Sequence, residues 1–178
     1  MMKILGRYAR GKVLDAGCGS GFFSKFFVNK NCKVFALDYS KESLKLTGSL
    51  GQKIKLIEGD ILKMPFDDKT FDLIFSDGLL EHYKNPIGIV SEFERVVKKN
   101  GIVATFVPNL ISYWLFIKRF KLGKIKEYRF SLKKLVELHE RAGLKIIESG
   151  GLSVLPSKGS PEFLAKYIGR LIYVIGKR

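Results

Sequence analysis

Cysteine and histidine are scarce in this chain of 178 residues, which has two of each. Cys18 and Cys32 are too few for a disulfide framework or a cysteine-based metal cluster, so we expect buried free thiols and no metal site. No charge-free apolar run approaches the roughly 18 residues that a membrane-spanning helix needs. The first residues lack the apolar stretch of a signal peptide, so we expect a cytoplasmic protein.

Acidic residues are also in short supply, because 17 Asp+Glu oppose 32 Lys+Arg and give a formal net charge of +15. Residues 1–100 hold 17 basic and 12 acidic side chains, whereas residues 101–178 hold 15 and 5. Such an excess could attract RNA, an anionic membrane surface or a phosphorylated substrate. The single glutamine, Gln52, and the abundant lysine resemble hyperthermophile composition instead, which favours an ordinary solvated basic surface.

Short apolar runs alternate with amphipathic segments along the chain. We expect strands in segments 12–17, 33–40, 54–61, 71–77, 101–108, 144–149 and 170–176, and helices in 21–30, 40–50, 86–99, 131–142 and 160–168. Strands that alternate with helices form a mostly parallel sheet with helices on both faces. The sequence therefore predicts one α/β domain over residues 1–178.

Local signals fix several helix ends. Ser40 is the expected N-cap of one helix, Pro86 lies near the start of another, and Gly143 ends a third. In segment 21–30 four phenylalanines are expected to share one buried face; they are Phe22, Phe23, Phe26 and Phe27.

A glycine turn, Gly17-Cys-Gly19-Ser-Gly21, directly follows the first expected strand. In a doubly wound sheet this turn lies at the carboxyl edge, where ligands bind. The dinucleotide pattern is G-x-G-x-x-G, but Phe22 stands where its third glycine would be. This departure argues against NAD.

Five motifs occur in a characteristic order: "VLDAGCGSGFFS", "FALDYS", "EGDILKMPF", "FDLIFSDGLLEHYKNP" and "EFERVVKKNG". Together they resemble the class I S-adenosylmethionine (SAM) dependent methyltransferases, and most closely the ubiquinone and menaquinone biosynthesis branch with its many small-molecule enzymes. The resemblance covers about residues 11 to 150. It implies a Rossmann-like doubly wound sheet of seven strands, SAM as cofactor and S-adenosylhomocysteine (SAH) as product.

The resemblance also assigns the nucleoside half of the cofactor. Asp38, 21 positions after Gly17, would accept hydrogen bonds from the ribose hydroxyls, with Tyr39 beside it. Asp60 would hold the adenine amino group, with the backbone N–H of Ile61 facing the ring.

The resemblance assigns the amino acid end of the cofactor to the glycine turn and the fourth strand. Asp15 would face it together with the backbone of the turn, and the carbonyls near Ser76 and Asp77 would hold its ammonium. The residues of the turn expected at the cofactor are Gly17, Cys18, Gly19 and Gly21.

His82 is the expected general base, because it follows the fourth strand where the family places residues beside the transferred methyl. His139 lies within an expected helix. In this branch the "EH" pair also serves structure, so a structural role for His82 stays open. Tyr83 is a further candidate contact.

Segment 109–130 follows the fifth strand, where this branch builds a lid over the acceptor. Its interleaved aromatic and basic residues fit RNA binding, an amphipathic cover over an apolar acceptor or membrane, or a lid packed on its own core. The region before the first strand is shorter than the family's usual one, so a second copy in a homodimer or a partner subunit could cover an open pocket.

The leading hypothesis is a SAM-dependent methyltransferase acting by direct displacement on a small-molecule or lipid-like acceptor. One alternative is an RNA methyltransferase that uses the basic C-terminal part, although no Asn/Asp-Pro-Pro-aromatic motif is present. The other alternative is a non-catalytic methyltransferase-like subunit of a complex.

Overall fold

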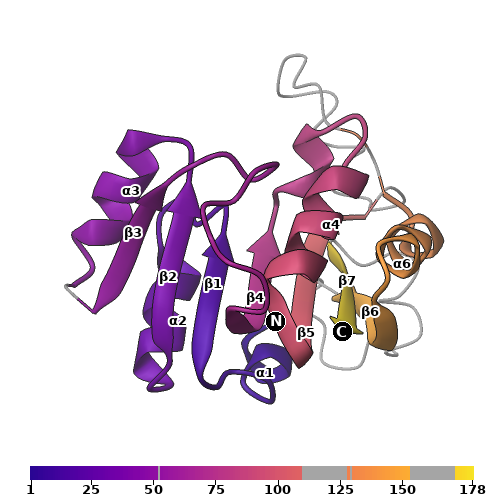
Figure 1. The fold of residues 1–178 in the computed structure, drawn as a ribbon, viewed down its shortest axis with the longest axis horizontal. Coiled ribbons are helices and arrows are strands. Elements are labelled where there is room, and N and C mark those ends of the chain that lie inside the picture. Colours follow the sequence, from indigo (N-terminus) through magenta and orange to yellow (C-terminus); the bar gives the residue numbers. More distant parts are fainter. Residues whose placement is uncertain (52, 110–127, 129, 153–170) are drawn as a thin grey trace, which may run out of the picture.

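A computed structural model describes residues 1–51, 53–109, 128, 130–152 and 171–178 (Figure 1). The elements follow one another as α1 (Met2–Leu5), β1 (Lys12–Ala16), α2 (Phe22–Asn29), β2 (Lys33–Asp38), α3 (Lys41–Gly48), β3 (Ile54–Glu58), β4 (Phe71–Asp77), the 3-10 turn η1 (Leu80–His82), α4 (Ile87–Val96), β5 (Val97–Pro108), α6 (Leu132–Arg141), β6 (Lys145–Leu152) and β7 (Leu171–Lys177). No helix in the described ranges is long and apolar enough to cross a membrane.

The strands form one seven-stranded sheet in the order β3-β2-β1-β4-β5-β7-β6. Strands β1 to β5 pair in parallel, and β7 lies antiparallel between β5 and β6. The predicted Rossmann-like, mostly parallel α/β fold is confirmed. Strand order reverses between β1 and β4, and a doubly wound sheet binds ligands at such a reversal.

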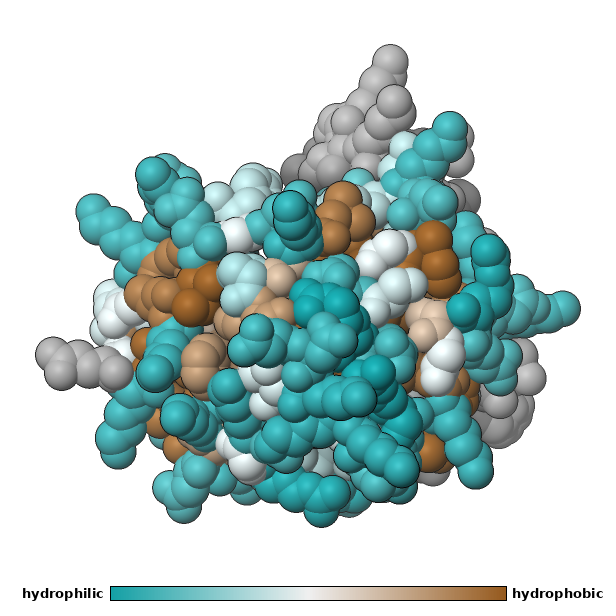
Figure 2. All heavy atoms as spheres, viewed as in Figure 1, coloured by the Kyte–Doolittle hydropathy of each residue, from teal (hydrophilic) through white to brown (hydrophobic). Residues whose placement is uncertain are grey.

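Both faces of the sheet are covered, as expected. Neighbouring residues of β1 alternate between the two hydrophobic cores: Leu14 belongs to the same core as Phe93 of α4 and Leu135 of α6, whereas Val13 belongs to the core that contains Phe27 of α2. This alternation follows from the two-residue period of a strand. Figure 2 shows that hydrophilic side chains cover most of the face seen in Figure 1, with smaller hydrophobic areas between them.

The helix expected over 86–99 ends earlier, at Val96, and β5 begins at once with Val97. Arg178 provides a physical reason, since its Nη1 donates to the carbonyls of Arg95 at 3.0 Å and Val97 at 2.9 Å. Those carbonyls are thereby satisfied outside the helix. Asn100 then takes a φ of 64°, and the pairing of β4 with β5 shifts register at this point.

The expected four-phenylalanine face of α2 is wrong for Phe22, whose side chain is 60% exposed. Phe27 is fully buried, Phe23 and Phe26 are partly buried, and Ser24 takes a place on the inner face. Phe22 is the first residue of the helix. It does not belong to the pair that packs on the core, Phe23 and Phe27, which are four residues apart.

The expected helix ends agree with the structure. The hydroxyl of Ser40 caps α3 by accepting from the backbone of Ser43, Pro86 directly precedes α4, and Gly143 has a φ of +90° just after α6. Strand β7 was expected, whereas the helix expected at 160–168 lies outside the described residues. Most of segment 109–130 also lies outside the described residues, and only its residues 109, 128 and 130 are described.

Candidate functional site

A cavity of about 610 Å³ opens where the strand order reverses, at the carboxyl ends of β1, β2 and β4. This volume lies within the usual range of small-molecule sites, roughly 300–1,000 Å³. Its lining consists of Gly17, Gly19, Leu37, Asp38, Tyr39, Ser40, Ser43, Gly59, Asp60, Ile61, Asp77, Gly78, Leu79, His82 and Tyr83.

The glycine turn forms one wall of this cavity. Gly17, Gly19 and Gly21 have φ values of 74°, 51° and 75°, a left-handed conformation that favours glycine. A Cβ on Gly19 would meet no atom within 4 Å, whereas one on Gly21 would lie 2.7 Å from Oγ1 of Thr47. Gly19 therefore keeps backbone open to the cavity, and Gly21, outside the lining, allows α3 to pack closely.

Asp38 ends β2 at the rim of the cavity and is held by two backbone groups. Its Oδ2 accepts from the N–H of Gly19 at 3.0 Å, and its Oδ1 accepts from the N–H of Ser40 at 2.9 Å. A carboxylate has about four acceptor positions, so both oxygens can still accept hydrogen bonds from a ligand. Tyr39 follows, also in the lining, with 79% of its surface exposed.

Asp60 and Ile61 line the cavity from the loop after β3. The N–H of Leu62 donates to Oδ1 of Asp60 at 2.9 Å, which fixes the carboxylate in a local turn. Gly59 donates its N–H to the carbonyl of Asp38 at 3.2 Å, so this loop starts against the end of β2. The two sides of the predicted nucleoside site therefore lie next to each other.

The end of β4 supplies the third side of the cavity. Burial raises the pKa of Asp77, which lines it, to about 6. Ser76 does not line the cavity; it is buried, and its hydroxyl has no hydrogen-bond partner within the described part of the chain. His82 is an exposed lining residue at the end of η1, and Tyr83 follows it.

Asp15 and Cys18 lie behind the glycine turn, outside the lining. Ser24 Oγ donates to Oδ2 of Asp15 at 2.6 Å, and burial raises the pKa of this carboxyl to about 7. The Sγ of Cys18 lies 3.5 Å from Oγ1 of Thr47, and burial raises the pKa of the thiol to about 12. In this structure both residues support the turn from the core side.

His139 is remote from the cavity and fully buried between α6 and β5. Its ring nitrogens lie 2.8 Å from the carbonyl of Leu135 and 2.9 Å from the hydroxyl of Thr105. Burial lowers its pKa to about 4, so the ring is neutral at pH 7. His82 is thus the histidine that the structure places at the cavity.

Sequence reasoning missed six lining residues: Leu37, Ser40, Ser43, Gly59, Gly78 and Leu79. Each is within a few positions of a residue that was predicted, so proximity to a strand end was the available signal. Leu79 needed the structure, because it reaches across to Gly17, where a Cβ would lie 3.1 Å from its Cδ1.

The charge of the lining is one-sided. Asp38, Asp60 and Asp77 contribute three carboxyl groups, and no lysine or arginine belongs to this lining in the described part of the chain. The same part contains no group of three or more His, Cys, Asp or Glu residues arranged to hold a metal ion. This set of side chains fits a ligand with positive charge and hydroxyl or amino donors.

Comparisons with known proteins agree with this geometry. A family model described as "Methyltransferase domain" matches residues 14–105. Malonyl-[acyl-carrier protein] O-methyltransferase of Hamiltonella defensa is 32% identical over 58% of the chain, and a sterol 24-C-methyltransferase of Gibberella zeae is 28% identical over 83%. The chain spans 40% and 39% of the lengths of these two relatives.

Solved structures have the same fold. A SAM-dependent methyltransferase from Mesorhizobium loti superposes with a TM-score of 0.79 at 16% identity, covering 99% of this chain and 95% of its own. A chain from the complex between the Haloferax volcanii methyltransferase activator Trm112 and a methyltransferase superposes with a TM-score of 0.74 at 20% identity. This match covers 93% of this chain and 81% of the other. Since the family model spans more than half of the sequence, the chain belongs to the SAM-dependent methyltransferases, with SAM as its cofactor.

Proposed function

We propose that this chain is a methyltransferase that moves a methyl group from SAM to a small-molecule or lipid-like acceptor. The one-sided charge of the cavity carries the proposal. SAM bears a positive sulfonium and an ammonium, and three carboxyl groups of the lining can attract them. In the described part of the chain the lining would offer a pyrophosphate only backbone N–H groups, beside three carboxyl groups that repel it.

The lining residues divide between the two halves of the cofactor in this proposal. Asp38 accepts from the ribose hydroxyls and Asp60 from the adenine amino group, with the backbone N–H of Ile61 facing the ring. Gly17, Gly19 and Asp77 hold the amino acid end. Hydrogen bonds to a charged group contribute about 1.5–3 kcal/mol, so loss of Asp38 should weaken binding roughly tenfold to a hundredfold.

The side chains have a limited chemical task. When bound, SAM supplies a methyl group already activated on a positively charged sulfur. The residues around the cavity therefore need to align the acceptor and exclude water, and such alignment can contribute about 7–11 kcal/mol. For an acidic acceptor, His82 would remove the proton, which typically contributes ~10²–10⁴-fold in rate.

A small or lipid-like acceptor is supported by two relatives, whose names state a malonyl-[acyl-carrier protein] and a sterol as substrates. Both likenesses are distant, and neither singles out the ubiquinone branch. We propose that residues 1–178 form a single domain and that the protein acts in the cytoplasm; the lid expected at segment 109–130 lies mostly outside the described residues.

A partner subunit is the alternative with a specific observation behind it. The Haloferax volcanii neighbour was solved together with a methyltransferase activator. In this alternative a second protein completes the pocket, and the isolated chain binds cofactor weakly or transfers no methyl group. RNA as acceptor rests on the net charge of residues 101–178 and on the interleaved aromatic and basic residues of segment 109–130.

The first experiment is a calorimetric titration of the purified chain with SAH, with NAD as the negative ligand. Asp38→Ala should weaken SAH binding at least tenfold. Glu58→Ala is the matched control, because Glu58 is an exposed carboxylate at the end of the neighbouring strand and does not line the cavity. Equal affinity of the two variants would overturn the assignment of Asp38.

Acceptor classes are then separated with methyl-labelled SAM. Label that enters small or lipid-like compounds supports the proposal. Label in RNA, with binding that weakens steeply as salt rises, would favour the RNA alternative. If the chain binds SAH but transfers label neither to small or lipid-like compounds nor to RNA, the result would favour an enzyme that needs a partner subunit.

A further inference from the structure

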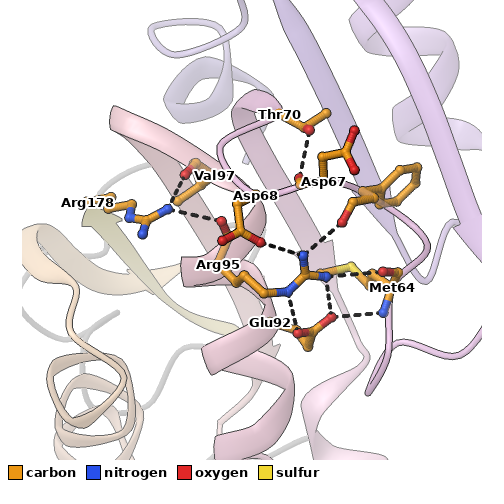
Figure 3. Close-up of polar contacts among 9 residues, drawn as sticks. Met64, Asp67, Asp68, Thr70, Glu92, Arg95, Val97 and Arg178 are labelled. Carbon is orange, nitrogen blue, oxygen red and sulfur yellow. Dashed lines mark hydrogen bonds and ion pairs between the residues drawn. The ribbon is translucent and has the colours of Figure 1, made fainter.

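The motif "EFERVVKKNG" contains none of the predicted cofactor residues, yet Arg95 within it is the centre of a dense polar network (Figure 3). Arg95 lies in the last turn of α4, three residues after Glu92, so both side chains share one face of the helix. That face meets the loop of residues 59–70, which joins β3 to β4.

This loop needs an external support. It runs from the edge strand β3 past β2 and β1 to β4 and has no helix or strand of its own. Its first residues, Gly59 to Ile61, line the cofactor cavity. The position of Asp60 therefore depends on what holds the rest of the loop.

Arg95 uses every donor that it has, and three of its five hydrogen bonds hold the loop. An arginine carries five N–H groups, and the side chain makes five hydrogen bonds of 2.7 to 3.1 Å. Two go to Glu92, one to the carboxylate of Asp68, and one each to the carbonyls of Met64 and Phe66.

Glu92 completes the attachment. Its Oε2 accepts from the N–H of Met64 at 2.9 Å, so the Glu92–Arg95 pair binds both backbone polar groups of that residue. The hydrogen bond from Arg95 holds the pKa of Glu92 below its ordinary range, which keeps the carboxylate charged. Met64 is buried and lies three residues after Ile61.

The far end of the loop is held by the same turn of helix. Lys69 donates its N–H to the carbonyl of Arg95 at 3.0 Å, and Thr70 donates to that of Val96 at 2.7 Å. The loop is thus fixed at its start by Asp38, in its middle by Glu92 and Arg95, and at its end by the backbone of α4.

We propose that Arg95, with Glu92, is a positioning residue for the adenine side of the cofactor site. It acts through the loop and does not itself line the cavity. The inference rests on the proposed function and adds a determinant of adenine selectivity that lies outside the pocket.

Arg95→Lys tests whether the planar guanidinium group is needed, because lysine keeps the positive charge but offers one nitrogen in place of three. The matched control is Lys98→Gln, which breaks a similarly exposed ion pair, 2.8 Å long, between Lys98 and Asp72 and leaves the loop contacts intact. In calorimetry at a temperature where both variants are folded, Arg95→Lys should bind SAH at least tenfold more weakly. Lys98→Gln should stay within twofold of the wild type.

The selectivity of the site separates positioning from general weakening. S-inosylhomocysteine carries an oxygen in place of the adenine amino group that Asp60 is proposed to hold. The wild type should prefer SAH to this analogue, and Arg95→Lys should reduce that preference at least threefold. Amide hydrogen exchange should also speed up in residues 60–66 of the ligand-free variant, beyond any change in Lys98→Gln.

An unchanged preference with unchanged exchange in residues 60–66 would overturn the inference, even if the affinity fell. If Arg95→Lys does not fold, Glu92→Gln carries the same test, since it weakens the hold on Arg95 and Met64. A wild-type chain that binds no SAH would overturn the proposed function and this role together. A wild type that binds SAH, beside an Arg95→Lys variant with the same preference and exchange, would overturn this role alone.

Discussion

The backbone N–H of Gly19 donates to Oδ2 of Asp38 at 3.0 Å, so the glycine turn and the end of β2 share one carboxylate. A ligand that hydrogen-bonds to Asp38 also meets the open backbone at Gly19. The glycine turn and the aspartate that ends β2 are therefore parts of one wall of the cavity.

Replacement of two glycines by alanine should have different effects. Either change places an L-residue in a left-handed conformation, at a cost of about 1–2 kcal/mol. Gly19→Ala puts a methyl group into open cavity and should weaken SAH binding at least tenfold with only that loss of stability. Gly21→Ala brings a Cβ within 3 Å of Thr47 and Leu50, so packing should cost about 1–3 kcal/mol more.

Urea unfolding and SAH titration of the two variants check this prediction. Equal losses of stability would contradict the packing role of Gly21. SAH affinity in Gly19→Ala equal to that of the wild type would show that the ligand does not approach this turn.

Asp15 should make the protein less stable as the pH rises. Its folded pKa is about 7 against an ordinary 3.8, because burial penalises the charged form. Between these values the folded state binds the proton and the unfolded state does not, so stability falls from pH 4 to pH 7 and stays low above it. Asp15→Asn keeps the shape and stays neutral, and should therefore be more stable than the wild type at pH 8.

Thermal unfolding of both proteins at pH 5 and pH 8 measures this effect. The advantage of Asp15→Asn should be largest at pH 8 and should shrink at pH 5. Ser24→Ala is a useful control, because it removes the hydroxyl that donates to Asp15 and leaves the carboxyl buried. A variant that is less stable than the wild type at pH 8 would contradict the argument.

His82→Ala should separate binding from turnover. His82 is exposed at the cavity, so its loss should leave the fold and the SAH affinity nearly unchanged. If it is the general base, turnover with the true acceptor at saturating SAM should fall ~10²–10⁴-fold. Full turnover in the variant would assign His82 a structural role only.

Much of the fold was readable from the sequence because its signals are local. Ser40 and Gly143 mark helix ends through their own backbone chemistry, and buried parallel strands appear as apolar runs. The early end of α4 was not readable, because the residue that satisfies its carbonyls, Arg178, lies 83 positions away from Arg95. The exposed position of Phe22 likewise depends on how α2 lies on the sheet.

The candidate site divides in the same way. Asp38 ends a strand, and Asp60 and His82 follow strands; the resemblance to the methyltransferase family assigned all three to the cofactor site, and all three line the cavity. The hydrogen bond that holds the carboxyl of Asp15 could not be inferred, because its donor is Ser24, a helix residue with no marked sequence signal. The support of the loop by Arg95 was also hidden, since two of its three partners in the loop are backbone carbonyls, which any sequence provides.

Every lining residue in the described part of the chain lies within residues Gly17 to Tyr83, whereas the sheet is complete only when Leu171–Lys177 enters between β5 and β6. During synthesis, all the groups proposed to contact the cofactor leave the ribosome before the strand that joins the other half of the sheet. The cofactor-binding half of the sheet is therefore encoded in one continuous stretch that is synthesised before β7.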